Sequence, residues 1–188
     1  MKSFPNLGPG LQGFTDHALG MHLSLYVREA ADFERLAGVN RMLTPVESPK
    51  VSALRNAIHL HEAFFGNLVR GGAPPSPSFA LRIKESFGSF EMMTQALTTA
   101  VNNAGESGWG VLCETDALSQ LEVISIRGHA EGSPFGRRIL FALDGFEHAY
   151  WTDFGPAKIS YLTTVLLQVD WRAVESRTLP TPSAGPPP

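Results

Sequence analysis

An apolar run that ends on a carboxylate constrains this chain more than any other feature of its sequence. Residues 138–143 (RILFAL) are short and apolar enough for a buried strand, and Asp144 follows at once. A lone carboxylate at the edge of a core is costly, so we expect Asp144 to be paired or bound to a metal ion. Residues four apart in a helical turn share a face, so Asp144 and His148 can reach one point, while Glu147 points elsewhere. By itself, the spacing also fits an aspartate capping a helix with a histidine behind it.

Composition limits the class of protein. The 188 residues are 43% hydrophobic and 18% charged, which fits one globular domain or two closely joined lobes. The net charge of −3 gives no indication of a nucleic-acid partner, which a basic patch usually marks. Cys113 is the only cysteine, which excludes an intrachain disulfide and a cysteine-rich metal site. No stretch approaches the ~20 apolar residues that span a bilayer, and the N-terminus lacks a signal-peptide core, so we expect a cytoplasmic protein without membrane contact.

Apolar residues at helical spacing predict a long first helix. Thr15 stands where a helix N-cap would, and the periodicity continues to about Leu36. His22 and Tyr26 lie one turn apart on the inward face of this helix. One histidine on an apolar stripe is more often a hydrogen-bonded core residue than a ligand, so His22 needs partners from elsewhere.

A second helix is predicted beyond a turn at residues 38–50, which contains glycine and proline. Its apolar residues recur at alternating steps of three and four from Val51 to Leu68, and His61 belongs to this stripe, whereas His59 lies off it. Two long helices joined by a short connection favour an antiparallel pair. Each helix would then bring one histidine into a shared seam.

The chain changes character after residues 71–77, a loop rich in glycine and proline. Two shorter helices are predicted next, at 78–86 and at 89–103 with Ser89 as a plausible N-cap. Three strand-like segments (109–115, 121–127 and 138–143) and a last helix (156–168) follow. We therefore predict an α+β fold: an N-terminal antiparallel two-helix hairpin, then a small three-stranded antiparallel sheet flanked by helices.

These boundaries predict a division of the chain into parts. The extended N-terminal segment and the hairpin occupy residues 1–72. The α+β domain occupies residues 73–177, and residues 178–188 hold five prolines, which is typical of a disordered tail.

Three imidazoles and one carboxylate from separate elements form the candidate site: His22, His61, Asp144 and His148. Mixed imidazole and carboxylate ligation suits iron, manganese or zinc. A zinc hydrolase usually has three protein ligands and a carboxylate base beside the metal-bound water. Four ligands leave one open position on a five-coordinate iron or manganese ion, which suits redox chemistry on a small molecule.

Several motifs, in one order, resemble the iron/manganese superoxide dismutase family. Residues 144–150 (DGFEHAY) resemble the family's D-x-W-E-H-A-Y element, and residues 61–68 (HEAFFGNL) resemble its second-helix pattern of histidine, phenylalanine, asparagine and leucine. The family's F-G-S-F, G-S-G-W and V-N-W elements are similar to residues 87–90 (FGSF), 106–109 (ESGW) and 169–171 (VDW). The resemblance spans roughly residues 7–177, and the ordered series is specific where one motif would be weak.

The resemblance implies one iron or manganese ion per chain, held by Asp144, His148, His61 and an N-terminal histidine. The metal would alternate between divalent and trivalent states while one superoxide is oxidised to dioxygen and the next is reduced to hydrogen peroxide. The resemblance also implies a homodimer in which Glu147 of one subunit hydrogen-bonds the ligand histidine of the other.

In many members of the family a glutamine tunes the redox potential of the metal through hydrogen bonds around the bound solvent, and this glutamine comes from one of two positions. Those positions here are Ala57 on the second helix and His129 beside the sheet, and some members carry histidine at the latter. We therefore take His129 as the candidate for this role, although it also fits an exposed turn histidine beside Gly128. Because neither position holds glutamine, the choice between iron and manganese stays open.

Two registers compete in the first helix. In one, His22 is the ligand, Tyr26 replaces a histidine near the site and faces its open side, and Ala30 replaces the entrance tyrosine. In the other, residues 20–27 match the family's G-K-H-H-x-x-Y-V, which puts Ala18 at the ligand position. We prefer the first register because it loses no ligand and keeps the capping threonine.

The alternative function is a catalytically lapsed member of the fold that serves as a structural or assembly protein. The changed first helix, with Phe146, Trp151 and Lys158 at positions where the family has other residues, keeps this alternative open. Retention of all four candidate ligands favours the enzyme. A di-metal carboxylate oxidase lacks support, because no E-x-x-H pair occurs on a predicted helix.

Overall fold

The computed structural model describes residues 1–8, 10–38, 47–115, 119–129 and 137–178. The predicted tail therefore lies, beyond Thr178, outside the described residues, as does most of the predicted turn before the second helix. Within these ranges no helix is both long enough and apolar enough to cross a membrane.

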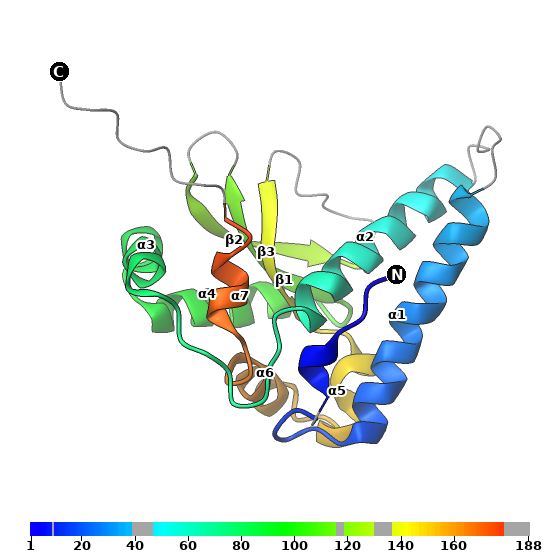
Figure 1. The fold of residues 1–188 in the computed structure, drawn as a ribbon, viewed down its shortest axis with the longest axis horizontal. Coiled ribbons are helices and arrows are strands. Elements are labelled where there is room, and N and C mark those ends of the chain that lie inside the picture. Colours follow the sequence, from blue (N-terminus) through cyan, green and yellow to red (C-terminus); the bar gives the residue numbers. More distant parts are fainter. Residues whose placement is uncertain (9, 39–46, 116–118, 130–136, 179–188) are drawn as a thin grey trace.

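The first two long helices lie side by side along one edge of the molecule and are joined at one end, as predicted for an antiparallel pair (Figure 1). They are α1 (Asp16–Ala37) and α2 (Glu47–Phe65). Thr15 caps α1 as predicted, because its hydroxyl oxygen accepts a hydrogen bond from the N–H of Ala18 at 3.1 Å. The predicted start of the second helix was wrong by one turn, since the helix includes residues 48–50. Pro49 is tolerated there because the N–H groups of a first turn have no partner within the helix.

Two shorter helices follow the loop after α2. They are α3 (Pro77–Phe87) and α4 (Phe90–Asn103). Ser89 caps α4 as predicted, accepting from the N–H of Met92, and Ser76 caps α3 in the same way. Beyond the sheet the predicted last helix is shorter than expected, and a further one-turn helix follows it. The C-terminal helices are α5 (Glu147–Phe154), α6 (Lys158–Leu166) and α7 (Trp171–Glu175).

The sheet confirms the predicted α+β class. Its three antiparallel strands lie in the order β2-β1-β3 and comprise β1 (Gly108–Thr115), β2 (Leu121–Arg127) and β3 (Arg137–Asp144). Asp144, the last residue of β3, pairs with Trp109 near the start of β1. The carboxylate that ends the apolar run therefore stands at the end of edge strand β3, beside the central strand β1, where α5 begins.

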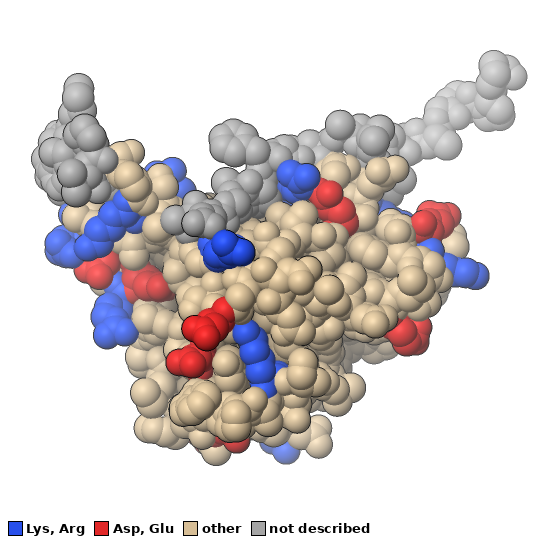
Figure 2. Space-filling view, turned by 180° about the vertical axis from the view of Figure 1, so that it is seen from behind, with Lys and Arg blue, Asp and Glu red and all other residues tan. Residues whose placement is uncertain are grey.

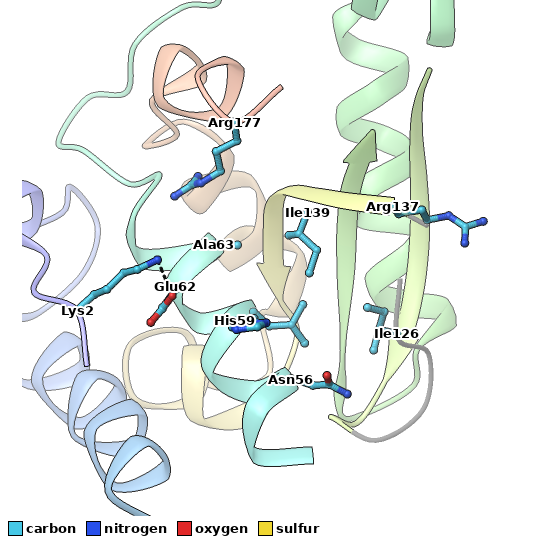
Figure 3. Close-up of a pocket in the computed structure, with 10 residues that line it drawn as sticks. Lys2, Asn56, His59, Glu62, Ala63, Ile126, Arg137, Ile139 and Arg177 are labelled. Atoms are coloured by element: carbon cyan, nitrogen blue, oxygen red, sulfur yellow. Dashed lines mark ion pairs between the residues drawn. The ribbon is translucent and has the colours of Figure 1, made fainter. Parts of the chain in front are cut away.

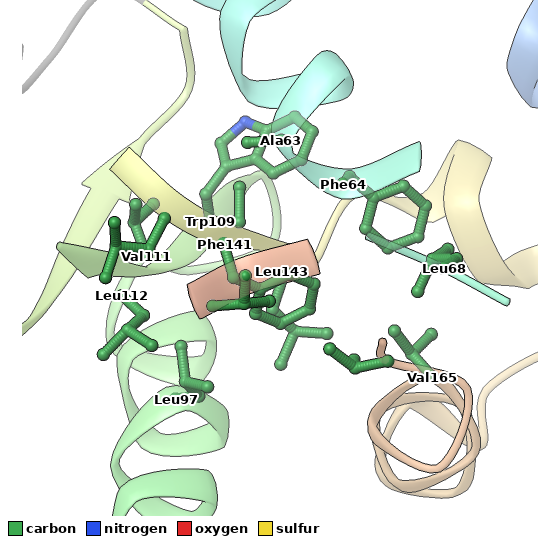
Figure 4. Packing of buried hydrophobic residues seen from close by; sticks show 14 of the residues in the cluster. Ala63, Phe64, Leu68, Leu97, Trp109, Val111, Leu112, Phe141, Leu143 and Val165 are labelled. Atoms are coloured by element: carbon green, nitrogen blue, oxygen red, sulfur yellow. The ribbon is translucent and has the colours of Figure 1, made fainter. Parts of the chain in front are cut away.

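The hydrophobic core surrounds β1 and β3 and includes α2, α4 and α6 (Figure 4). Trp109, Phe141 and Leu143 of the sheet are fully buried, as are Leu97 of α4 and Val165 of α6. Burial of one such side chain contributes roughly 1.5–3 kcal/mol to the free energy of unfolding. This packing holds the strand ends rigidly beneath the two long helices.

On the face opposite to that in Figure 1, a broad area without charged side chains is bordered by Lys, Arg, Asp and Glu, some of which lie close to the middle of this face (Figure 2). Several large apolar side chains are exposed on the described surface, among them Met21, Trp151 and Ile159, at 57%, 55% and 61%.

Candidate metal centre

Four side chains from four elements converge below the helix pair. His22 comes from α1, His61 from α2, Asp144 from the end of β3 and His148 from the first turn of α5. One donor atom from each lies within 4.8 Å of the donor atoms of the others. Asp144 Oδ2 is the shared neighbour, at 3.1 Å from His22 Nε2, 3.2 Å from His148 Nε2 and 3.8 Å from His61 Nε2. The structure thus brings together all four residues that the sequence singled out.

The turn between β3 and α5 fixes how Asp144 presents its carboxylate. Asp144 Oδ1 accepts a hydrogen bond from the N–H of Phe146 at 2.8 Å, which leaves Oδ2 to the histidines. The N–H of Gly145 donates to the carbonyl of Gly108 at 2.9 Å and anchors the turn to β1. A Cβ on Gly145 would lie 2.3 Å from Val101 Cγ1, so only glycine fits between this turn and α4.

Burial and mutual contact shift the pKa values of these groups. Burial lowers the pKa of His22 to about 4, which outweighs the opposing effect of Asp144. Burial alone would raise the pKa of Asp144, but the neighbouring His148 and His22 hold it well below its usual value. Burial also opposes the charge on His148, yet Asp144 beside it raises the pKa of this partly exposed histidine.

Two buried nitrogens test whether these residues fit a metal ion. His22 Nε2 and His61 Nε2 lack a hydrogen-bond partner in the part of the chain that the structure describes. His61 Nδ1 lies 2.9 Å from the carbonyl of Ala57, and a carbonyl can only accept, so Nδ1 carries the proton. The lone pair of His61 Nε2 therefore faces the centre. Buried polar atoms seldom lack a partner, and a cation among three imidazoles and one carboxylate would supply one, so the residues fit.

His129 lies beside the centre, as the prediction of a hydrogen-bonding role there requires. Its ring is 6.0 Å from that of His61 and stacks on Phe146 at 4.7 Å. The indole N–H of Trp109 donates to His129 Nδ1 at 3.3 Å. Burial lowers the pKa of His129, so the neutral ring dominates near neutral pH.

The Tyr26 hydroxyl does not lie where the sequence placed it. The ring is buried 6.3 Å from that of His61, but the hydroxyl donates to Glu62 Oε1 at 3.1 Å and accepts from the N–H of Lys2 at 2.9 Å. Both hydrogen bonds lead to groups outside the four donors. Tyr26 ties α1 to α2 and to the N-terminal segment instead of facing an open side of the site.

Sequence reasoning missed one carboxylate near the centre. Glu29 of α1 places Oε2 3.2 Å from His61 Nδ1 and Oε1 3.9 Å from His129 Nε2. Helical spacing could have found it, because residues 22, 26 and 29 follow the i, i+4, i+7 rule for one face.

The remaining predicted positions lie around the site. Ala57 and Ala30 are buried, at 1% and 4% exposed. Glu147 is exposed on α5, and Trp151, one turn later on the same helix, is 55% exposed.

A cavity of about 400 Å³ beside α2 contains none of the four converging residues (Figure 3). Lys2 and Arg177 contribute cations to its wall. Lys2 pairs with Glu62 at 2.7 Å, and Arg177 donates to Asn67 and to the carbonyl of Leu140. These cations already have partners within the chain, and the cavity is separate from the metal centre.

An α+β fold in which three histidines and one aspartate converge, three of the four residues buried, defines a protein whose side chains could hold a single metal ion. Comparison with known proteins also indicates a metal-binding protein. The description of the C-terminal domain of iron/manganese superoxide dismutases matches residues 75–177. A manganese superoxide dismutase of Haloferax volcanii is 33% identical over 145 residues, covering 77% of this chain and 68% of the relative.

Two further relatives carry different metals in their names. A manganese superoxide dismutase of Haloferax mediterranei is 32% identical over 143 residues, covering 72% of this chain and 88% of the relative. An iron superoxide dismutase of Methanothermobacter thermautotrophicus is 33% identical over 121 residues, covering 63% and 59%. The chain belongs to the iron/manganese superoxide dismutase family.

Proposed function

We propose that this protein is a superoxide dismutase that holds one iron or manganese ion per chain through His22, His61, Asp144 and His148. The observation that carries the proposal is the convergence of four donor atoms within 4.8 Å, with two imidazole nitrogens that have no other partner among the described residues. The names of relatives from both metal types support the activity and leave the metal open.

Two superoxide anions and two protons give one dioxygen and one hydrogen peroxide. An iron or manganese ion held by His22, His61, Asp144 and His148 would supply the one-electron redox chemistry that couples the oxidation of one superoxide to the reduction of the other. The chain's part is to hold three imidazoles and one carboxylate in fixed positions. The rings of Phe64 and Phe65 pack on His22 at 5.4 and 4.7 Å and exclude water from that side.

We further propose a homodimer joined through α5, in which Glu147 bonds the partner's His148. The exposed Glu147 and Trp151 support this, because one turn separates them and the pair gives α5 an outward face that is both apolar and acidic. A carboxylate bonded to a ligand histidine orients the ring and raises its basicity. Glu147→Ala should shift the protein toward monomer in analytical ultracentrifugation and lower metal affinity about 10- to 100-fold. A monomeric wild type would contradict the proposal.

The function is tested by measuring metal content and superoxide consumption on the same purified protein. His61→Ala should lose both, whereas His59→Ala, an exposed histidine on the same helix, should keep both. A wild type that binds no iron or manganese would refute the metal centre.

A catalytically lapsed protein is the second candidate. The observations that favour it are the Tyr26 hydroxyl, engaged by Glu62 and Lys2, and the small Ala30 at the position of the family's entrance tyrosine. Stoichiometric metal without superoxide consumption would select this candidate over the enzyme.

A further inference from the structure

We propose that Glu29 is a positioning residue of this centre, whose carboxylate holds the His61 and His129 rings from the side opposite to the four donors. The proposal concerns contacts within the chain, and it rests on the proposed function only where it predicts an effect on bound metal. Nothing in the family resemblance assigned a role to this position.

The Glu29 carboxylate is largely buried, so its negative charge needs hydrogen-bond donors or cations nearby. Its side chain is 15% exposed, and Oε2 is a buried atom without a hydrogen bond of accepted geometry to any described residue. His61 Nδ1 lies 3.2 Å from that oxygen. A carboxylate in such surroundings is stabilised by donors that point toward it, and leaving it without them costs several kcal/mol.

The His61 ring offers a suitable donor. The Ala57 carbonyl already requires a proton on Nδ1, so this N–H lies between two acceptors, the carbonyl at 2.9 Å and Glu29 Oε2 at 3.2 Å. A negative charge at this nitrogen favours proton placement on Nδ1 and makes Nε2 more basic. Glu29 therefore strengthens the face of His61 that points to Asp144.

The His129 ring offers the second N–H donor, and its contact with Trp109 determines which ring nitrogen carries the proton. An indole N–H can only donate, so the contact from Trp109 makes His129 Nδ1 an acceptor. The neutral ring must then carry its proton on Nε2, the nitrogen 3.9 Å from Glu29 Oε1. At this distance the attraction is electrostatic, or passes through one water molecule, rather than a direct hydrogen bond.

Glu29 thus joins α1, α2 and the segment after β2 at one point. His129 is linked to His61 through this carboxylate and through Phe146, whose ring stacks on both His129 and His148. The first helix contributes two groups to the centre: His22 toward Asp144, and Glu29 behind His61.

The test uses nitrogen-15 NMR of the histidine rings in the metal-free full-length protein, with Mn²⁺ affinity measured separately by chelator competition. In the wild type, His61 should be protonated on Nδ1 and His129 on Nε2. The His61 Nδ1–H should resonate at low field and exchange slowly with water. The opposite tautomer in either ring would overturn the proposal.

Glu29→Gln keeps the shape of the side chain and removes its charge. We expect the His61 Nδ1–H signal to move upfield and exchange faster, and Mn²⁺ affinity to fall about 10- to 100-fold. Glu34→Gln, an exposed carboxylate on the same helix, is the matched control and should change neither. A Glu29→Gln protein that behaves like the control, or that shows the signal change with unchanged affinity, would overturn the proposal. If the wild type binds neither Mn²⁺ nor Fe²⁺, the proposed function fails, while the ring signals still decide the Glu29 contacts.

Discussion

The two halves of the metal centre are built in different ways. Asp144 and His148 are four residues apart in the sequence. The turn that carries them is fixed by two hydrogen bonds, from the N–H of Phe146 to the Asp144 carboxylate and from the N–H of Gly145 to the carbonyl of Gly108. His22 and His61 lie on separate helices, and their separation depends on how α1 packs on α2. One half is therefore set by local geometry, and the other by packing between distant segments.

The two halves also fall in different parts of the chain. The matched family description covers residues 75–177, which include the local half and exclude both helices of the other half. Glu29 and Ala30 belong to α1, and therefore to the half that depends on packing between helices. Four experiments test this contrast.

The largest effect should come from Asp144→Asn, because this residue contacts histidines from both halves. The variant should lose essentially all bound iron or manganese, measured by elemental analysis after purification. Asp16→Asn changes an exposed carboxylate at the start of α1 and should keep full occupancy. Metal retained by Asp144→Asn would show that the local half does not bind it.

His22→Ala tests the half that depends on packing. Loss of an imidazole donor should weaken metal binding more than about 100-fold, beyond the scale for residues that only support a ligand. His17→Ala, an exposed histidine on the same helix, should leave affinity unchanged. If His22→Ala keeps its metal, the preferred register is wrong and Ala18 marks a lost ligand.

The metal-free protein should show opposite pH responses from the two halves. His22 has a folded pKa of about 4, below its unfolded value of 6.5, so its stabilising contribution is complete above pH 6.5 and is lost as pH falls toward 4. The difference of 2.5 corresponds to about 3 kcal/mol at ~1.4 kcal/mol per pKa unit. The pKa of His148 is raised, so its contribution is present below pH 6.5 and is lost as pH rises through the folded value.

Urea denaturation of the metal-free protein between pH 4 and pH 8 would measure both responses. His22→Ala should flatten the acid side of the stability profile, and His148→Ala the alkaline side. Identical profiles for the two variants would contradict the opposite shifts.

The smallest effect concerns the contact between the halves. Thr15 caps α1 and also donates through its hydroxyl to Asp153 Oδ1 of α5 at 2.7 Å. Thr15→Ala should lower the free energy of unfolding by ~1 kcal/mol, the usual value for a lost cap. Thr163→Ala, which removes an exposed hydroxyl within α6, should cost less. Equal losses in urea denaturation would remove the special role of this cap.

The sequence predicted the local half of the centre and the elements around it because short-range rules govern them. Capping residues, strand alternation and the four-residue spacing of Asp144 and His148 all act within one turn or one strand. It also selected His22 and His61, since each interrupts an apolar stripe.

Contacts between helices were harder to predict. Glu29 shares a face with His22, but which side of that face meets His61 depends on the rotation of α1 against α2. The position of the Tyr26 hydroxyl could not be predicted for a similar reason, because it hydrogen-bonds to Glu62 of another helix and to the backbone of Lys2. No rule of spacing along one helix contains that information.

The lack of space for a side chain at Gly145 limits which substitutions this sequence can accept during evolution. Val101 of α4 occupies the space that a methyl group at position 145 would need, at 2.3 Å from its Cβ. The carbonyl oxygen of Gly108 would also lie 2.8 Å from that Cβ, so a smaller residue at 101 alone would not make room for a side chain at 145. We therefore expect glycine to persist at position 145 among descendants of this chain, whichever residue stands at 101.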